Sequence, residues 1–184
     1  MKVSATQIER FAWALAAVWT VVVAASVVWN MDHGKQMALE AARIQAQTSY
    51  EKDIIYRRWN AMHGGVYVPV TEETPPNPYL SHISDRDITT PSGKKLTLMN
   101  PAYMSRQVYE LERKKYSFIG HIASLNPINP QNAPDLWETK ALEAFVPGEI
   151  EISSVDKMEG KDYMRLMRPL IVEKTCLKCH AHQG

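Results

Sequence analysis

The strongest constraint in this sequence is a stretch of nineteen residues, 11–29, that contains no charged side chain. As an α-helix it would be about 28 Å long, close to the ~30 Å hydrocarbon core of a lipid bilayer. A helix in a soluble core is rarely apolar on every face over this length. A cleaved signal peptide is the closer alternative, because Ala24-Ala25-Ser26 offers small residues to a peptidase, but its apolar region is usually only about 7 to 15 residues long. We therefore expect residues 11–29 to be an uncleaved transmembrane helix.

A second helical segment is expected after this span. Residues 30–34 could bend the chain, and apolar residues then recur at mostly three- and four-residue spacing until His63-Gly64-Gly65 ends the pattern. The recurring residues are Met37, Ala41, Ile44, Tyr50, Ile55, Trp59 and Met62. We assign residues 30–62 to this helix, with two interpretations: a helix packed on its own domain, or a stalk that links domain and membrane and forms the seam of a parallel homodimer.

Residues 63–184 form the remaining domain, which is predicted to be α+β. Helix breakers are concentrated there, since all eleven prolines lie at or beyond Pro69. Because strands and helices do not alternate in an ordered repeat, we expect an antiparallel sheet with flanking helices. Strands are predicted at 66–70, 95–99, 116–125, 149–155 and 162–172, a polar loop at 71–92, and helices at 101–115 and 135–145.

Local signals support several of these boundaries. Asn100 and Pro101 are a favourable N-cap and first residue for the helix 101–115. Glu159-Gly160 suits the turn of a hairpin formed by the last two strands. Pro69 indicates that the first strand is at a sheet edge, because proline cannot donate to the ladder.

Composition argues against several classes of protein. The formal net charge of +1 does not suit a nucleic-acid-binding surface, which usually has a strong excess of Lys and Arg. Two cysteines cannot form a disulfide framework. No cluster of acid and base residues points to catalysis, so we do not expect an enzyme such as a peroxidase.

The chemical signature lies near the C-terminus, in Cys176-Leu177-Lys178-Cys179-His180. This is C-x-x-C-H, the attachment pattern of c-type haem. Cysteines at this spacing can form thioethers with the two vinyl groups of one haem, and the adjacent histidine can ligate its iron. The motif therefore predicts one covalent haem c held by Cys176 and Cys179, with His180 as proximal axial ligand.

Three other readings of the motif are weaker. A thioredoxin-like dithiol would be expected near a βαβ pattern, whereas this pair follows a hairpin. Zinc bound by Cys176, Cys179, His180 and His182 would need four tetrahedral ligands from seven residues, and adjacent Cys179 and His180 converge poorly on one ion. A disulfide between the cysteines would leave the histidine unexplained.

Haem attachment also bears on topology, because it takes place on the outer side of the cytoplasmic membrane. We expect a single-pass protein of the inner (cytoplasmic) membrane whose N-terminus, residues 1–10, is cytoplasmic and whose haem domain, residues 63–184, is periplasmic or its equivalent. Lys2 and Arg10 agree with this orientation, although Lys35 and Arg43 reduce the charge difference.

Several short segments together resemble a bacterial family of periplasmic c-type haem sensor domains. They are residues 64–69, 77–80, 96–97, 100–104, 106–107, 121–127, 132–138, 167–170 and 176–184. The resemblance implies a PAS-like fold with one covalent haem, often placed before a second span and a histidine kinase or a cyclic-dinucleotide synthase. Members of the family are regarded as redox or gas sensors.

The sequence departs from this family in two respects. Relatives usually continue after the haem motif with strands that complete the sheet, whereas this chain continues for four residues after His180, so we expect the C-terminal strand to be missing or supplied from elsewhere. Some relatives use a cysteine as the sixth haem ligand, and both cysteines here are already assigned.

The distal axial position therefore has several candidates. Met99 and Met104 lie in the segment where relatives place this ligand, His121 lies on a predicted strand, and His63 lies beside the glycine pair. A water-bound or open iron is a further alternative. Arg106, Arg165 and Arg168 could pair with haem propionates, and the sequence does not distinguish among them.

Two functions follow from this reading. In the first, a membrane-anchored monohaem c-type cytochrome domain senses redox state or a small ligand and transmits the signal to a partner. In the second, the domain is an electron-transfer subunit of a larger membrane complex. Axial ligation is a main determinant of haem potential and of access for small ligands, so the sixth ligand bears directly on this choice.

Overall fold

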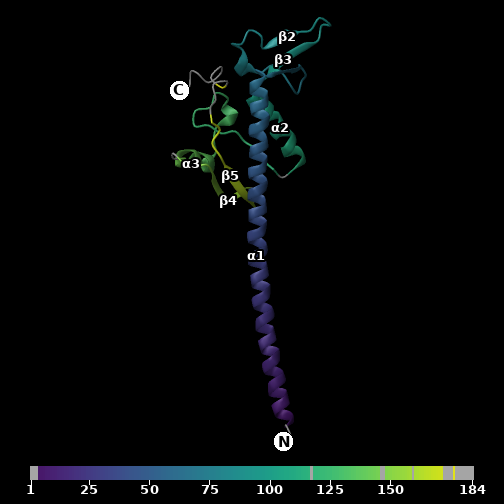
Figure 1. Cartoon of the computed structure of the whole chain (residues 1–184), viewed down its shortest axis with the longest axis vertical. Helices are drawn as coiled ribbons and strands as arrows, with labels where there is room; N and C mark the ends of the chain where they lie inside the picture. Colours follow the sequence, from purple (N-terminus) through teal and green to yellow (C-terminus); the bar gives the residue numbers. More distant parts are fainter. Residues whose placement is uncertain (1–3, 117, 146–147, 159, 172–175, 177–184) are drawn as a thin grey trace. The chain divides into compact units, whose positions relative to one another are not determined.

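The computed structural model describes residues 4–116, 118–145, 148–158, 160–171 and 176 (Figure 1). The fold is mixed α+β with small antiparallel sheets, as predicted. The chain divides into two compact units, Met1–Gln45 and Ala46–Gly184. Along the chain, the elements are α1 (Ala5–Met62), β1 (Val66–Pro69), η1 (Pro78–Leu80), β2 (Asp87–Thr89), β3 (Lys95–Met99), α2 (Pro101–Lys115), η2 (Pro130–Asn132), α3 (Leu136–Ala144), β4 (Ile152–Met158) and β5 (Lys161–Met167).

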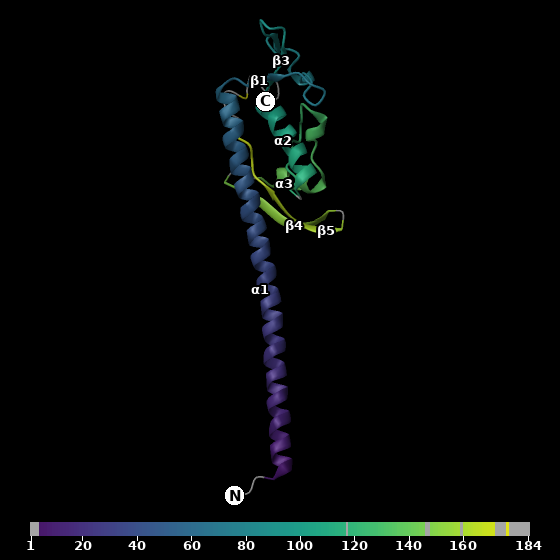
Figure 2. The same ribbon diagram turned by 90° about the vertical axis from the view of Figure 1, so that its right-hand side faces the viewer.

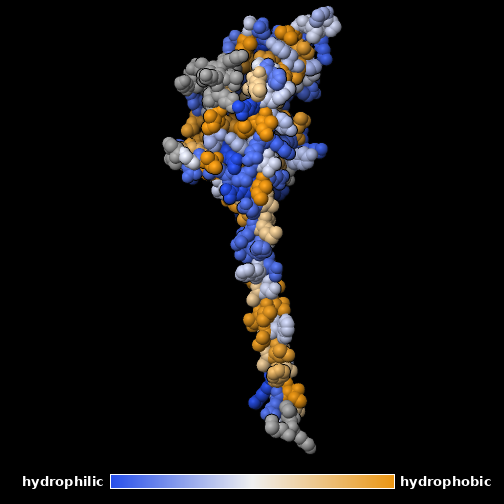
Figure 3. All heavy atoms as spheres, in the orientation of Figure 1, coloured by the Kyte–Doolittle hydropathy of each residue, from blue (hydrophilic) through white to orange (hydrophobic). Residues whose placement is uncertain are grey.

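The N-terminal unit consists of the first part of α1, and its apolar side chains are exposed (Figure 3). Within the part of the chain that the structure describes, α1 is the one helix long and apolar enough to cross a membrane. Residues 30–34, which could have bent the chain, do not do so, because α1 continues through them. Asn30 Nδ2 donates to the carbonyl of Ser26 at 2.7 Å, and a single helical glycine, Gly34, costs only about 1 kcal/mol.

The end of α1 is where the glycine pair predicts it. The N–H of Gly65 donates to the carbonyl of Asn60 at 2.9 Å, and that of Gly64 to Ala61 at 3.0 Å. This is a Schellman ending, and it needs a left-handed residue, which Gly64 supplies with φ of 74°. Gly65 also has a positive φ, of 101°, and a Cβ there would lie 2.7 Å from Cδ1 of Leu98.

Three strands form the first sheet in the order β1-β3-β2, with both pairings antiparallel. The central strand β3 has the predicted bounds, and β1 is an edge strand, as Pro69 indicates. Strand β2 was not predicted, because it lies inside the polar loop. It pairs Asp87 with Thr97, and the hydroxyl of Thr97 donates to Asp87 Oδ1 at 2.7 Å.

Helices α2 and α3 begin at side-chain caps. Asn100 Oδ1 accepts from the N–H of Tyr103 at 2.9 Å, and α2 has the predicted bounds. Asp135 and Glu138 form a reciprocal capping box at the start of α3. Each cap satisfies N–H groups that a helix start leaves without partners.

The second sheet is the predicted hairpin of β4 and β5, paired from Ile152↔Met167 to Met158↔Lys161. It lies beside the part of α1 that contains Gln47 and Tyr50, several turns before the helix ends (Figures 1 and 2). Gln47 Nε2 donates to Glu151 Oε2 at 2.8 Å, and the hydroxyl of Tyr50 donates to the carbonyl of Pro169, also at 2.8 Å.

The strand predicted at 116–125 is wrong for the residues described there, which form no ladder. Their polar groups bond to the following loop and helix instead. The N–H of Ser124 donates to the carbonyl of Asn132 at 3.0 Å, and the His121 ring bonds to Glu138. Hydrogen bonds to η2 and α3 thus replace those of a sheet.

The interior of the C-terminal unit is unusually polar. Among the described residues, the buried apolar side chains are Leu80, Leu98, Met99, Tyr103 and Ala141, and the buried polar ones are Asn60, Asn77, Thr97, Ser105, Asn129 and Glu138. Buried polar groups are costly unless they are hydrogen-bonded. Specific hydrogen bonds therefore help to define this interior, together with apolar packing.

We expect Asn100→Ala to lower the free energy of unfolding by about 1 kcal/mol, because it removes the acceptor at the start of α2. Asn100→Asp keeps an acceptor oxygen and should retain most of that stability. Urea denaturation of the full chain in detergent measures both. Equal stability of the alanine variant and the unsubstituted protein would contradict the role of the cap.

Candidate functional site

The first residue of the C-x-x-C-H motif, Cys176, is half-buried. Cys179 and His180 lie outside the described residues. The surroundings of the motif are therefore defined through Cys176 and the side chains that interact with it. Cys176 is among the electrostatic partners of Arg57, a half-buried residue near the end of α1.

Arg57 belongs to a polar stripe on α1 made by Asp53, Arg57 and Asn60. This spacing puts the three side chains on one face of the helix. Each bonds to α2 or to the chain just before it. The hydroxyl of Tyr109 donates to Asp53 Oδ2 at 2.5 Å, Arg57 donates to Ser105 Oγ at 3.3 Å, and Asn60 donates to the carbonyl of Met99 at 3.1 Å.

The face of α1 that packs on the domain is thus polar, although the apolar residues were expected to mark it. Ile55, Trp59 and Met62 are 63%, 53% and 73% exposed, whereas Asn60 is fully buried. The apolar repeat follows the exposed side of these turns.

Burial changes the proton affinities along the stripe. It lowers the pKa of Arg57, and the electrostatic interactions with Tyr109, Cys176 and Asp53 oppose this shift. Burial raises the pKa of Asp53, against the hydrogen bond from Tyr109. Burial and the bond to Asp53 raise the pKa of Tyr109. A guanidinium in these surroundings is a favourable partner for an additional anionic group.

Asn60 links the stripe to the two candidate methionines. Its Nδ2 donates to the carbonyl of Met99 and lies 3.7 Å from Sδ of Met104. Its Oδ1 is buried and has no hydrogen-bond partner among the described residues. An unpaired buried acceptor is uncommon in native proteins and needs an explanation.

The two methionines differ in their surroundings. Met99 is the last residue of β3 and only 5% exposed, so it is part of the core. Met104 lies in the first turns of α2 and is half-buried. Its sulfur contacts Asn60, which is less than one helical turn along α1 from Arg57, the residue that interacts electrostatically with Cys176.

Neither candidate histidine bonds to a residue of the polar stripe through its ring. His121 uses both ring nitrogens, Nδ1 with Glu138 Oε1 at 2.8 Å and Nε2 with the carbonyl of Gln131 at 3.0 Å. In this arrangement no ring nitrogen is left for a metal. His63 is exposed, and its Nδ1 lies 2.7 Å from the carbonyl of Trp59.

Of the three arginines considered for propionates, two pair with carboxylates. Arg165 bonds to Asp135 Oδ2 at 2.7 Å and lies over the Trp137 ring. Arg168 bonds to Glu151 Oε2 at 2.8 Å. Arg106 instead stacks on Tyr103, with Cζ 5.3 Å from the ring centroid.

Residues 35–184, most of the chain, match the Tll0287-like family. The chain belongs to this family. The match extends through the C-x-x-C-H motif, and the family is associated with haem binding. No curated protein and no solved structure matches the chain.

For this member of the Tll0287-like family, sequence reasoning identified the motif but missed Arg57, Asn60 and Asp53. Their i, i+4, i+7 spacing was a usable signal, because it is also the spacing of one helix face. Within the described residues, no group of three His, Cys, Asp or Glu side chains is placed to hold a metal ion.

The His121–Glu138 pair predicts a pH-dependent contribution to stability. The hydrogen bond with Glu138 raises the pKa of His121, against burial, so this contribution is complete below about pH 6.5 and is lost as pH rises through the raised pKa. Burial opposes ionisation of Glu138, but the bonds from His121 and Asp135 lower its pKa overall. The contribution of Glu138 is therefore lost as pH falls through the lowered pKa.

We expect His121→Gln to destabilise the protein by about 1 kcal/mol more at pH ~5.5 than at pH ~8.5, because the charged pair is present only at the lower value. Thermal unfolding at both pH values measures the difference. The exposed His82 provides the control variant His82→Gln. An equal loss at both pH values for His121→Gln would refute the charged pair.

Proposed function

We propose that this protein is a membrane-anchored monohaem c-type cytochrome domain that senses redox state or a small ligand. The observation that carries the proposal is the C-x-x-C-H motif inside the segment that matches the Tll0287-like family. The combination is specific, because the motif contains the only two cysteines of the sequence.

Three motif residues would hold the group. Cys176 and Cys179 would hold a haem through thioether bonds, and His180 would ligate its iron. When bound, haem c supplies a reversible one-electron couple and a metal whose distal position can accept a small ligand.

The described residues fit such a group in two respects. Their buried apolar side chains are few for a unit of this size, and a porphyrin would supply the apolar filling that a close-packed interior needs. Arg57 offers a half-buried cation close to Cys176, suitable for a propionate.

Met104 is our proposed distal ligand. The Sδ atom contacts Asn60 on the stripe that interacts with Cys176, whereas the nitrogens of His121 are both engaged. The Asn60 amide would hold the thioether in a fixed orientation, and second-shell bonds of this kind tune a metal site. Methionine ligation raises haem potential, which would suit a sensor of oxidising conditions.

The finer features of the proposal come from the sequence. They are a PAS-like arrangement whose C-terminal strand is missing or supplied from elsewhere, a single span at 11–29 in the inner membrane, and a haem domain on the periplasmic side. We further propose that the exposed apolar residues of α1 beyond the span form a homodimer seam, through which a signalling partner receives the change of state. If sensing is refuted, the alternative function is that of an electron-transfer subunit of a larger membrane complex.

Cys176→Ala/Cys179→Ala should abolish covalent haem, because no other thiol is available. Haem staining after denaturing electrophoresis measures this loss, and each single variant should retain at most one thioether. Retention of covalent haem in the double variant would refute the attachment.

The distal ligand can be tested with two matched variants, Met104→Leu and Met99→Leu, which remove a sulfur and keep most of the apolar volume. The first should shift the visible spectrum, lower the midpoint potential and allow prompt carbon monoxide binding by the reduced protein. The second should leave all three unchanged.

Three other results would change this proposal. Unchanged spectra in Met104→Leu would exclude Met104 as the ligand. Prompt carbon monoxide binding by the unsubstituted reduced protein would show an open distal position and weaken the electron-carrier alternative. A six-coordinate protein that stays inert to carbon monoxide would weaken gas sensing and leave redox sensing.

A further inference from the structure

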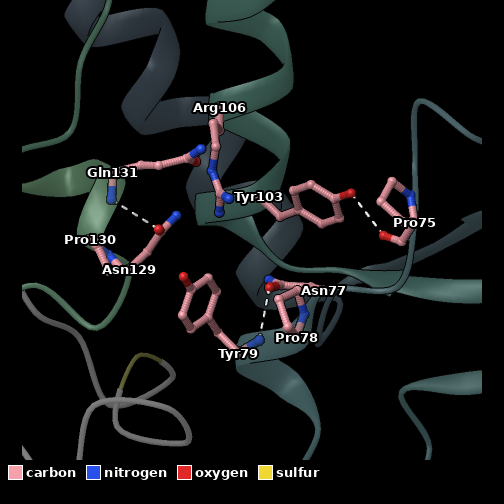
Figure 4. Close-up of a pocket in the computed structure, with 9 residues that line it drawn as sticks. All are labelled: Pro75, Asn77, Pro78, Tyr79, Tyr103, Arg106, Asn129, Pro130 and Gln131. Carbon is pink, nitrogen blue, oxygen red and sulfur yellow. Dashed lines mark hydrogen bonds between the residues drawn. The ribbon is translucent and has the colours of Figure 1, made fainter.

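A pocket of about 300 Å³ lies between α2, η1 and η2 (Figure 4). Its apolar walls include the proline rings of Pro75, Pro78 and Pro130. This volume is at the small end of the range for ligand pockets. The pocket therefore suits a compact molecule that can contact apolar rings.

Arg106 supplies the charge of the pocket. It comes from α2, is half-buried and stacks on the ring of Tyr103. Among the described residues, no carboxylate lies within ion-pair distance of Arg106, in contrast to Arg165 and Arg168. A guanidinium held in this way can bind a planar anion through two parallel hydrogen bonds.

Asn129 provides a second, independent observation. It is only 6% exposed, and its Oδ1 accepts from the N–H of Gln131 at 3.0 Å, which fixes the orientation of the amide. Its Nδ2 is buried and has no hydrogen-bond partner among the described residues. Figure 4 shows this nitrogen directed into the pocket towards Arg106. A buried donor without a partner carries a free-energy cost that a bound acceptor would remove.

Tyr79 completes the polar part of the pocket. It belongs to η1, and its N–H donates to Asn77 Oδ1, so the turn that carries the ring is capped. Its hydroxyl points towards the same space as Arg106 and Asn129 (Figure 4). A guanidinium, an amide N–H and a phenol thus converge from three separate elements.

We propose that this pocket binds a carboxylate, with Arg106 and Asn129 as donors to its two oxygens and the proline rings against its apolar part. The apolar walls favour an organic carboxylate over inorganic phosphate. The carboxylate can be a free small molecule or a propionate of the bound haem. The pocket itself does not depend on the proposed function; only the propionate alternative does.

Isothermal titration calorimetry with benzoate on the full-length, haem-loaded protein in detergent is the direct test. We expect saturable benzoate binding, and about tenfold or weaker affinity for benzamide and for phosphate. Benzamide binding as tight as that of benzoate would overturn the anion site, and tight phosphate binding would overturn the carboxylate assignment.

Two variants connect binding to the named donors. Asn129→Asp keeps the acceptor for Gln131 but replaces the unpaired donor by a negative oxygen, and Arg106→Gln removes the charge. Each should weaken benzoate binding about tenfold or more. Arg113→Gln, on an exposed arginine in the last turn of α2, is the matched control and should bind normally. Normal binding by Arg106→Gln would overturn the proposal even if Asn129→Asp failed to fold.

The same titration on Cys176→Ala/Cys179→Ala separates the two sources of carboxylate. Binding by both the haem-loaded protein and this variant identifies a site for a free carboxylate. Binding by the variant alone identifies a site filled by a propionate. Absence of saturable binding in both, up to about 10 mM benzoate, would refute the pocket as a carboxylate site.

Discussion

One fully buried amide, that of Asn60, joins three parts of the C-terminal unit. Its side chain bonds to the end of β3 and contacts the sulfur in α2, and its backbone carbonyl accepts the bond that ends α1 at Gly65. A shorter or apolar side chain would remove the donor to the carbonyl of Met99, and a buried polar group left unpaired costs about 1 to 3 kcal/mol. The relation of helix, strand and second helix thus depends on a residue that apolar patterning would never select.

The polar interior that surrounds Asn60 has a general consequence for how the unit is specified. Apolar packing tolerates substitutions of similar volume, whereas a hydrogen-bonded interior tolerates few, because each donor requires its own acceptor. Thr97 with Asp87, and Glu138 with His121, follow the same rule as Asn60. Such an interior favours a defined geometry over high stability, as the proposed attachment of a rigid haem would require.

Local signals predicted the elements that have local causes. Asn100 and Pro101 identified the start of α2, and the glycine pair the end of α1. The failures had distant causes. Residues 116–125 bond to η2 and α3 instead of forming a ladder, and the packed face of α1 is set by partners at least 39 residues away. The C-x-x-C-H motif could be recognised from its spacing, and the helical spacing of Arg57 with Asp53 and Asn60 was also readable, but the unpaired donor of Asn129 depends on tertiary packing and could not be predicted.

The two glycines after α1 also predict how this sequence can vary among its relatives. Gly64 has a left-handed backbone, and a Cβ there would meet no other atom within 4 Å, so asparagine, which tolerates that conformation, is an acceptable replacement. Gly65 combines a positive φ with a neighbouring side chain that a Cβ would strike. Any other residue there is therefore disfavoured both by backbone strain and by a steric clash. Over evolutionary time the first position should drift and the second should not, although the two are neighbours in one turn.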